Sequence, residues 1–98
     1  MVIIVTRDVA DRFRGFLASV MIEVAPGVYV APAMTKGVRT RTWTVVEGWF
    51  GEIGGGSIVM CWRARNEPGH LGIVTVGTPP CNLFDADGIY LGYRPKTA

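Results

Sequence analysis

The sequence predicts one α+β domain in which two helices cover one face of an antiparallel sheet. Three observations lead to this fold class. Short runs of β-branched residues indicate strands, and two longer segments repeat apolar residues at helical spacing, which indicates helices. The strand and helix segments are interspersed within one chain of 98 residues, which indicates that they belong to the same domain. A chain of this length holds one domain, and its apolar fraction of 49% suffices for a packed core.

The first thirty residues predict a strand, a helix and a hairpin. The run "VIIVT" at residues 2–6 is β-branched throughout, which predicts a strand buried on both faces. Asp8 stands at an N-cap position for a helix whose apolar stripe continues to Val20. Two runs rich in β-branched residues within residues 22–30 flank the turn dipeptide Pro26-Gly27, and this pattern predicts a hairpin.

The middle of the chain predicts a second helix and then two strands. The helix runs from Thr35 to about Ile53, and the three glycines at 54–56 end it. Strands are expected over residues 57–63 and 72–76, because both runs are apolar and the turn "NEPGH" separates them.

The last segment, "NLFDADGIYLGYR", predicts one more strand or a small hairpin around Asp87-Gly88. It is apolar and has strand spacing, so it is suited to pairing with another sheet edge. We therefore place a core domain at residues 1–81 and a strand-forming, partner-binding extension at residues 82–98.

The order of the predicted elements is that of the split βαβ, or ferredoxin-like, plan: βαββαβ with extra C-terminal strands. In this plan both helices cover one face of the sheet and leave the other face open. We expect the open face to carry one residue from each of three pairs, Ile3 or Ile4, Val28 or Val30, and Met60 or Trp62. An uncovered apolar face predicts a partner, and we expect a homodimer that forms through the sheet.

The charge pattern leaves the kind of ligand open. The formal net charge is +2, and eight of the ten Lys and Arg residues precede Asn66. A basic N-terminal part is suited to phosphate, but ordinary solvated side chains give the same pattern. The two cysteines and the single histidine lack the spacing of a zinc site.

We expect a cytoplasmic protein that does not enter a membrane. No apolar run approaches the roughly 20 residues of a membrane span. The start, "MVIIVTRD", lacks the positive segment and the small-residue cleavage site of a signal peptide. Two cysteines far apart are consistent with a reducing compartment.

Five segments, "VIIVT", "RFRGFL", "EVAPGVYV", "GSIVMCW" and "DADGI", follow one another along the chain. Together they resemble the small CRISPR adaptation protein of the Cas-two family, in its type I-E subgroup. The subgroup has R-x-R-G-x-L in its first helix, E-V-x-x-G-V-Y-V in its hairpin, N-V-V-M-x-W in a strand and D-L-D-G-L in its tail. The resemblance covers nearly the whole chain, from Val2 to Pro95.

The resemblance implies a ferredoxin-like domain that dimerises by packing two sheets face to face. It also implies a role in antiviral defence, as a non-catalytic scaffold between dimers of the CRISPR integrase. The complex captures a short double-stranded DNA, the protospacer, and inserts it into the CRISPR array as a new spacer. The integrase performs the chemistry, so the scaffold role requires no cofactor.

The resemblance also implies which side chains meet the ligands. Arg12 and Arg14 match the family's helix-one arginines, which face DNA phosphates; the alternative is that both are solvated, aided by a salt bridge to Asp11. Lys36 and Arg39 are expected to bind DNA for a different reason, which does not depend on the resemblance: they begin the second helix, where free backbone N–H groups attract phosphate. The expected integrase contacts are Leu83, Phe84, Ile89, Tyr90 and Leu91.

Asp8 carries the alternative function. Many family members are described as metal-dependent endonucleases acting on RNA or duplex DNA, and an acid after the first strand would share a magnesium ion across the dimer axis. The competing interpretation is that Asp8 caps the helix. In the type I-E pattern the acid directly follows the strand's threonine, whereas here Arg7 takes that place. A cation beside the metal would oppose binding.

Aromatic and thiol side chains are expected to be structural. Helical or strand spacing favours a core role over base stacking for Tyr29, Trp43, Trp49, Phe50 and Trp62. Cys61 is expected to be an inert buried thiol and His70 an exposed turn residue.

Overall fold

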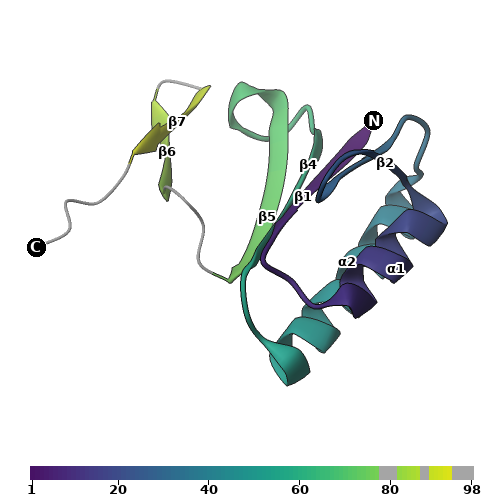
Figure 1. The fold of residues 1–98 in the computed structure, drawn as a ribbon. Helices are drawn as coiled ribbons and strands as arrows, with labels where there is room; N and C mark the ends of the chain where they lie inside the picture. The colour runs from purple at the N-terminus through teal and green to yellow at the C-terminus, as the bar shows by residue number, and fades with distance from the viewer. Residues whose placement is uncertain (78–81, 87–88, 94–98) are drawn as a thin grey trace, which may run out of the picture.

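The computed structural model describes residues 1–77, 82–86 and 89–93, with the last two ranges described as backbone only. Figure 1 shows the arrangement of the elements. They are β1 (Val2–Arg7), α1 (Asp11–Val20), β2 (Ile22–Ala25), β3 (Val28–Ala31), α2 (Lys36–Ile53), β4 (Ser57–Arg63), a 3-10 turn (Pro68–His70), β5 (Leu71–Gly77), β6 (Asn82–Ala86) and β7 (Ile89–Tyr93).

Five strands form one antiparallel sheet in the order β2-β3-β1-β4-β5. Both helices lie against the same face of this sheet (Figure 1). The first four strands have the ferredoxin-like order, and β5 extends the sheet as the hairpin partner of β4. The predicted α+β, ferredoxin-like class is confirmed. No described helix is long and apolar enough to cross a membrane.

The tail forms a hairpin, which is one of the two forms that the sequence left open. β6 and β7 pair with each other in a separate two-stranded sheet. The five predicted integrase-contacting residues lie on these two strands, with Phe84 opposite Leu91 in the backbone register. Their side chains lie outside the described residues.

The core lies between the helices and one face of the sheet. Ile4 is fully buried at the centre, where it pairs with Tyr29 of β3 and Met60 of β4. Ten apolar residues are buried in this layer: Val2, Ile4, Phe13, Leu17, Met21, Tyr29, Ala31, Val46, Ile58 and Met60. Because side chains alternate along a strand, β1 contributes only every second residue to this core.

The prediction that β1 is buried on both faces is wrong for the single chain. Ile3 is 36% exposed and Val5 is 43% exposed, because no described element covers that side of the sheet. The register places Ile3 opposite Val30 and Cys61, and it places Val5 opposite Val28 and Val59. Opposed residues of an antiparallel pair share a face, so these side chains form an apolar open face.

The register corrects the sequence-based list of open-face residues. Ile3 points outward while Ile4 is buried, and both Val28 and Val30 belong to the open face. Neither Met60 nor Trp62 does, because Met60 pairs with Ile4 and Trp62 with Val2 on the helix side. The β4 residues of the open face are instead Val59 and Cys61. Cys61 is half-buried, and burial raises the pKa of its thiol, which therefore stays protonated at neutral pH.

Aromatic side chains fill the space between the two helices. Trp49 of α2 packs edge-on against Phe13, with ring centroids 6.0 Å apart, and against Phe16, at 5.3 Å. Phe50 also packs against Phe13, with ring centroids 6.5 Å apart. Trp43 and Trp62 also pack against the buried cluster. The predicted core role of the aromatics is confirmed, as is the exposed turn position of His70.

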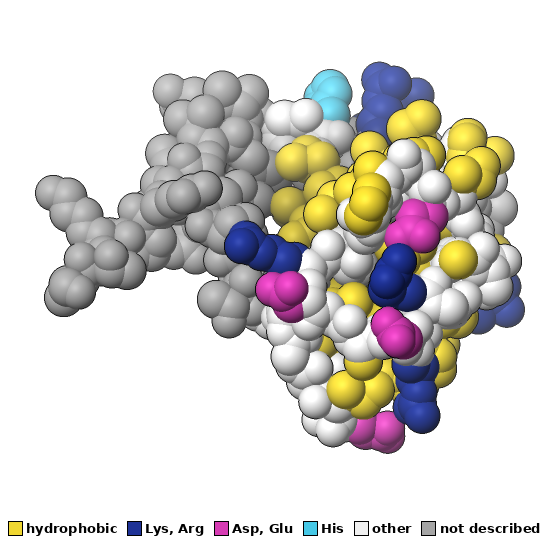
Figure 2. All heavy atoms as spheres, in the orientation of Figure 1, with side chains coloured by type: hydrophobic (Ala, Val, Ile, Leu, Met, Phe, Trp, Pro, Cys, Tyr) yellow, Lys and Arg dark blue, Asp and Glu magenta, His cyan; other side chains and the backbone are white. Residues whose placement is uncertain are grey.

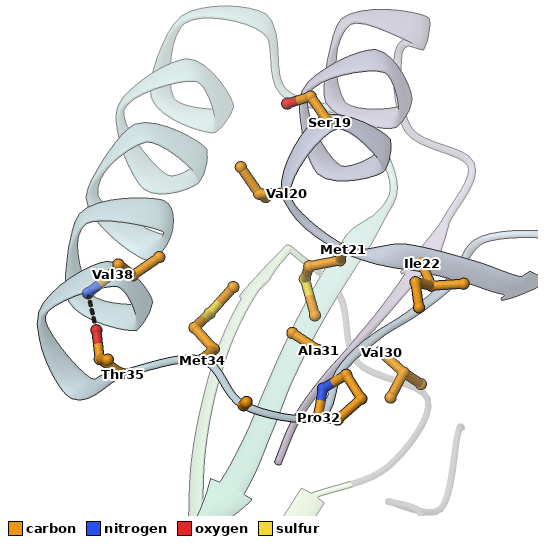
Figure 3. Close-up of a pocket in the computed structure, with 11 residues that line it drawn as sticks. Ser19, Val20, Met21, Ile22, Val30, Ala31, Pro32, Met34, Thr35 and Val38 are labelled. Atoms are coloured by element: carbon orange, nitrogen blue, oxygen red, sulfur yellow. Dashed lines mark hydrogen bonds between the residues drawn. The ribbon is translucent and has the colours of Figure 1, made fainter.

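The two helix starts differ. At α2 the Oγ1 atom of Thr35, the residue at which the sequence predicts the helix to begin, accepts a hydrogen bond of 3.3 Å from the backbone N–H of Val38 and so caps the helix (Figure 3). At α1 the predicted cap is wrong. Ala10 occupies the N-cap position, and Asp8 has a left-handed φ of 54° that turns the chain two residues earlier.

The glycines at 54–56 end α2 as predicted and then bring the chain back against β1. The backbone N–H of Gly54 bonds to the carbonyl oxygen of Phe50 at 2.8 Å. Gly56 has φ of 74°, and a Cβ atom there would overlap the carbonyl oxygen of Arg7 and meet that of Asp8. The close approach fixes the end of β1, because Arg7 pairs with Ser57 immediately after this glycine.

Gly56→Ala should therefore destabilise the fold more than Gly55→Ala. Both positions have positive φ, but the space around Gly55 is open. We expect Gly55→Ala to cost about 1–2 kcal/mol from the left-handed backbone alone, and Gly56→Ala to cost at least about 1 kcal/mol more from the backbone clash. Urea denaturation of the two variants measures the difference, and equal midpoints would contradict the close contact.

Candidate nucleic-acid interface

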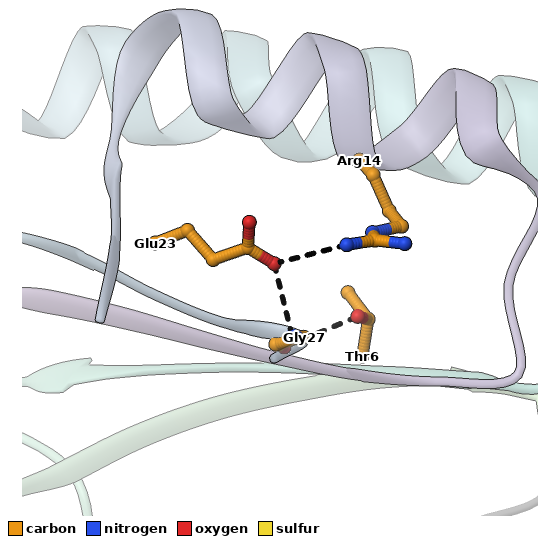
Figure 4. A network of polar contacts seen from close by, with 4 residues as sticks. All are labelled: Thr6, Arg14, Glu23 and Gly27. Atoms are coloured by element: carbon orange, nitrogen blue, oxygen red, sulfur yellow. Dashed lines mark hydrogen bonds and ion pairs between the residues drawn. The ribbon is translucent and has the colours of Figure 1, made fainter. Parts of the chain in front are cut away.

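The side chain of Arg14 projects from α1 over the β2–β3 hairpin and enters a polar network (Figure 4). Its Nη2 atom lies 3.7 Å from Oε2 of Glu23. The same oxygen accepts a hydrogen bond of 3.0 Å from the backbone N–H of Gly27. The carbonyl oxygen of Gly27 in turn accepts from the backbone N–H of Thr6, at 2.7 Å, and from its Oγ1, at 3.1 Å. The network joins the end of β1, the hairpin turn and one guanidinium.

Gly27 is required at the centre of this network. Its φ is 77°, a conformation that most residues avoid, and a Cβ atom there would lie 2.8 Å from the carbonyl oxygen of Thr6. Only a residue without a side chain lets the turn approach β1 closely enough for both Thr6 hydrogen bonds. The "PG" turn of the sequence therefore positions Glu23 as well as closing the hairpin.

The network keeps Glu23 ionised. The N–H of Gly27 lowers the pKa of this carboxyl group, and the nearby Arg14 charge lowers it further. Tyr29 lies beneath the pair, and burial raises the pKa of its phenol. The Tyr29 hydroxyl lies beside Arg14 and Glu23, but it has no hydrogen bond of good geometry to any described residue.

Arg12 faces a different part of the molecule. Two residues along a helix correspond to a rotation of roughly 200°, so Arg12 and Arg14 point away from each other. The Arg12 guanidinium carbon lies 5.2 Å from the ring centroid of Trp49 on α2, while the side chain remains exposed. The expected salt bridge to Asp11 does not form at Arg14, whose ionic partner is Glu23.

Lys36 and Arg39 lie at the opposite end of the helical layer. Lys36 precedes Trp49 by 13 residues, which is about 20 Å along α2. This end of α2 meets the end of α1 across an apolar groove that includes Val20, Met34 and Val38 (Figure 3). Arg39 is half-buried, with its guanidinium carbon 4.3 Å from the ring centroid of Trp62. The fold therefore separates the predicted basic residues into two groups.

Acidic side chains lie among these basic ones. Figure 2 shows Lys and Arg side chains interspersed with Asp and Glu on the visible face, with no single basic patch. Long-range attraction of a polyanion by such a surface is weak. Arginine on this chain is suited to short-range, directed contacts with phosphate.

Asp8 does not form a magnesium site within one chain. It lines a hollow of about 260 Å³ together with Thr6, Arg14 and Gly27, and its side chain is 86% exposed. The Nε atom of Arg7 lies 4.0 Å from Oδ2 of Asp8. No three metal-ligating side chains gather anywhere in residues 1–77. Magnesium needs several oxygen ligands, whereas this hollow offers one side-chain carboxylate beside cations.

The role of Glu23 was missed at the sequence level. The hairpin pattern placed Glu23 on a strand, but its pairing with Arg14 joins two elements whose relative position only the fold sets. The alternation of side chains along the strand could have indicated this role. Glu23 lies opposite Tyr29, whose side chain faces the helices, so Glu23 lies on the same side of the sheet. A carboxylate on the helix-facing side of an edge strand requires a partner from that layer.

A comparison with protein families completes the assignment. The family described as "CRISPR-associated protein (Cas_Cas2CT1978)" matches residues 1–91. The match includes every element of the five-stranded sheet and both helices, and it confirms the resemblance at the level of the family; the type I-E subgroup stays a prediction. The chain therefore belongs to this CRISPR-associated family, whose members function in CRISPR defence.

Proposed function

We propose that the chain is a cytoplasmic, non-catalytic scaffold that binds duplex DNA in the CRISPR spacer-integration complex. The observation that carries the choice of scaffold over nuclease is the surroundings of Asp8. One exposed carboxylate lies beside Arg7 and shares its hollow with Arg14. Such surroundings attract an anion such as phosphate more readily than a divalent cation.

Arginines on α1 supply the proposed DNA contacts. Guanidinium groups pair with phosphate oxygens through two parallel hydrogen bonds and carry no sequence information. Arg12 and Arg14 are exposed on one helix and are held by contacts to Trp49 and Glu23. Lys36 and Arg39 form a second, distant group, which suits a ligand as long as a duplex.

A homodimer completes the proposed scaffold. The open face carries Ile3, Val5, Val28, Val30 and Cys61, and a second copy of the same face would cover it. A two-fold axis would also double the number of α1 arginines available to one duplex. We further propose that the tail, residues 82–98, binds the CRISPR integrase.

The alternative function is a magnesium-dependent endonuclease that uses Asp8 from both subunits. It is favoured by the position of Asp8, an exposed carboxylate directly after the central strand. Such a site would be completed only by the second copy, because one chain supplies a single carboxylate there.

The DNA-binding proposal predicts that the affinity for DNA depends less steeply on salt concentration in Arg12→Gln and in Arg14→Gln. For every phosphate contact removed, the slope of log K against log salt should become shallower by about 0.9. The measurement is fluorescence anisotropy of a labelled duplex with the assembled complex. Arg65→Gln is the control, because Arg65 is exposed in the turn after β4. Slopes identical to wild type in both α1 variants would contradict the proposed contacts.

Asp8→Asn separates the scaffold from the nuclease. Asparagine tolerates the left-handed backbone and removes only the charge. Because Asp8 does not cap α1, we expect the stability to stay within about 0.5 kcal/mol of wild type, and spacer integration to be retained. Integration assays and magnesium-dependent cleavage assays are run side by side. Wild-type cleavage that disappears in Asp8→Asn would support the nuclease, and loss of integration from a folded variant would contradict the scaffold.

The proposed dimer predicts opposite outcomes for two matched substitutions. Ile3 is 36% exposed on the open face, and Val38 is 37% exposed in the helical layer. Ile3→Glu would place two charges in the proposed interface and should give a monomer, whereas Val38→Glu should remain dimeric. Light scattering at micromolar concentration measures the mass. A wild-type monomer, or a dimeric Ile3→Glu variant, would contradict assembly through the sheet.

A further inference from the structure

We infer that Glu23 is a positioning residue that pairs with Arg14 in the free protein. When DNA binds, the Arg14 guanidinium leaves Glu23 and pairs with a phosphate. Because the pairing with Glu23 must first be broken, Glu23 lowers the affinity for DNA. This inference rests on the proposed DNA-binding function. It assigns a role to a carboxylate that the predicted DNA contacts do not include.

The geometry indicates which of the two partners is fixed. Oε2 of Glu23 is anchored at 3.0 Å by the N–H of Gly27, whose carbonyl oxygen is itself held twice by Thr6. The contact from Arg14 to the same oxygen is 3.7 Å, well beyond the 2.7–2.9 Å or so of a short charge-assisted hydrogen bond. The carboxylate is therefore held by the hairpin, and the guanidinium is the group that can change partners.

The difference in solvent exposure between Arg14 and Glu23 indicates that Arg14 can move toward solvent. Its side chain is 54% exposed, whereas that of Glu23 is 31% exposed. Tyr29, a strand residue whose hydroxyl lies beside both groups, is fully buried, so solvent does not lie on that side. The guanidinium therefore reaches an incoming phosphate by moving outward, away from Glu23. A phosphate in that place can accept two parallel hydrogen bonds, which the 3.7 Å contact does not provide.

Glu23 opposes the exchange in two ways. Its pairing with Arg14 must weaken before phosphate binds, and its charge then remains close to the phosphate. Asp8 shares the hollow with Arg14, and Asp11 lies three residues earlier on α1. Among these acids Glu23 is the one in ionic contact with the guanidinium, so it should have the largest effect on DNA affinity.

Glu23→Gln tests the inference in the full chain. The glutamine Oε1 can still accept from the Gly27 N–H, so the turn is kept while the charge is removed. We measure the Kd of a labelled duplex of arbitrary sequence for the assembled complex over a range of salt concentrations. Glu23→Gln should bind up to about fivefold more tightly at low salt, the scale of an exposed ion pair. Asp11→Asn is the control for removing any nearby negative charge, and its gain should be smaller.

A double-substitution cycle separates pairing from general charge effects. In an Arg14→Gln background, Glu23→Gln should lose most of its gain, because the side chain that it releases is gone. Thermal unfolding of each variant shows that the hairpin is intact. Wild-type or weaker binding by a folded Glu23→Gln variant would overturn the inference, as would a full gain in the Arg14→Gln background.

The same measurements distinguish failure of the inference from failure of the proposed function. If Arg14→Gln weakens binding but Glu23→Gln does not strengthen it, DNA contact by Arg14 stands and the role of Glu23 is overturned. If Arg14→Gln binds like wild type and keeps its salt slope, Arg14 does not contact the duplex, and both proposals fail at this residue.

Discussion

The register of β1 between β3 and β4 is the constraint on which the rest of the structure depends. It places Ile4 between Tyr29 and Met60 under the helices. A shift of β1 by one residue would turn Ile3 inward and expose Ile4, so the core specifies this register strongly. The same alignment decides which residues form the open face and where the strand ends. Two glycines secure that end, with Gly27 bonded to Thr6 and Gly56 packed against Arg7.

Most of the basic side chains that are predicted to bind DNA already contact another side chain of the fold, although the chain has little net charge. Three of the four predicted DNA contacts already have a partner in the fold: Arg12 lies over Trp49, Arg39 lies over Trp62, and Arg14 pairs with Glu23. At Arg12 and Arg39 these contacts restrict long side chains before any ligand arrives, which lowers the entropic cost of binding. A carboxylate partner also lowers the available positive charge, whereas an aromatic partner leaves it intact. The two kinds of contact therefore have opposite effects on affinity for phosphate.

The division of the sheet into two faces links stability to assembly. The helices bury one face with an aromatic cluster around Trp49, and the other face remains apolar without described cover. A domain of this size buries a modest fraction of its surface, so covering a second apolar face would add to its stability. The proposed scaffold function and the stability of the fold are thus both served by the same partner, a second copy of the chain that covers the open face.

Local patterns in the sequence determined the elements, because β-branched runs, an amphipathic stripe and glycine stops act over a few residues. They also determined the fold class, since few topologies fit the order of the elements. The errors arose where a decision was not local. Asp8 has the right residue type for a cap, but the left-handed backbone at this residue places Ala10 at the helix start. Only the tertiary structure decided that Cys61, and not Met60 or Trp62, joins Ile3 on the open face, because that choice depends on the alignment of strands more than fifty residues apart in sequence. It likewise decided that Arg14 pairs with Glu23, because the packing of α1 over the hairpin sets the distance between the two side chains.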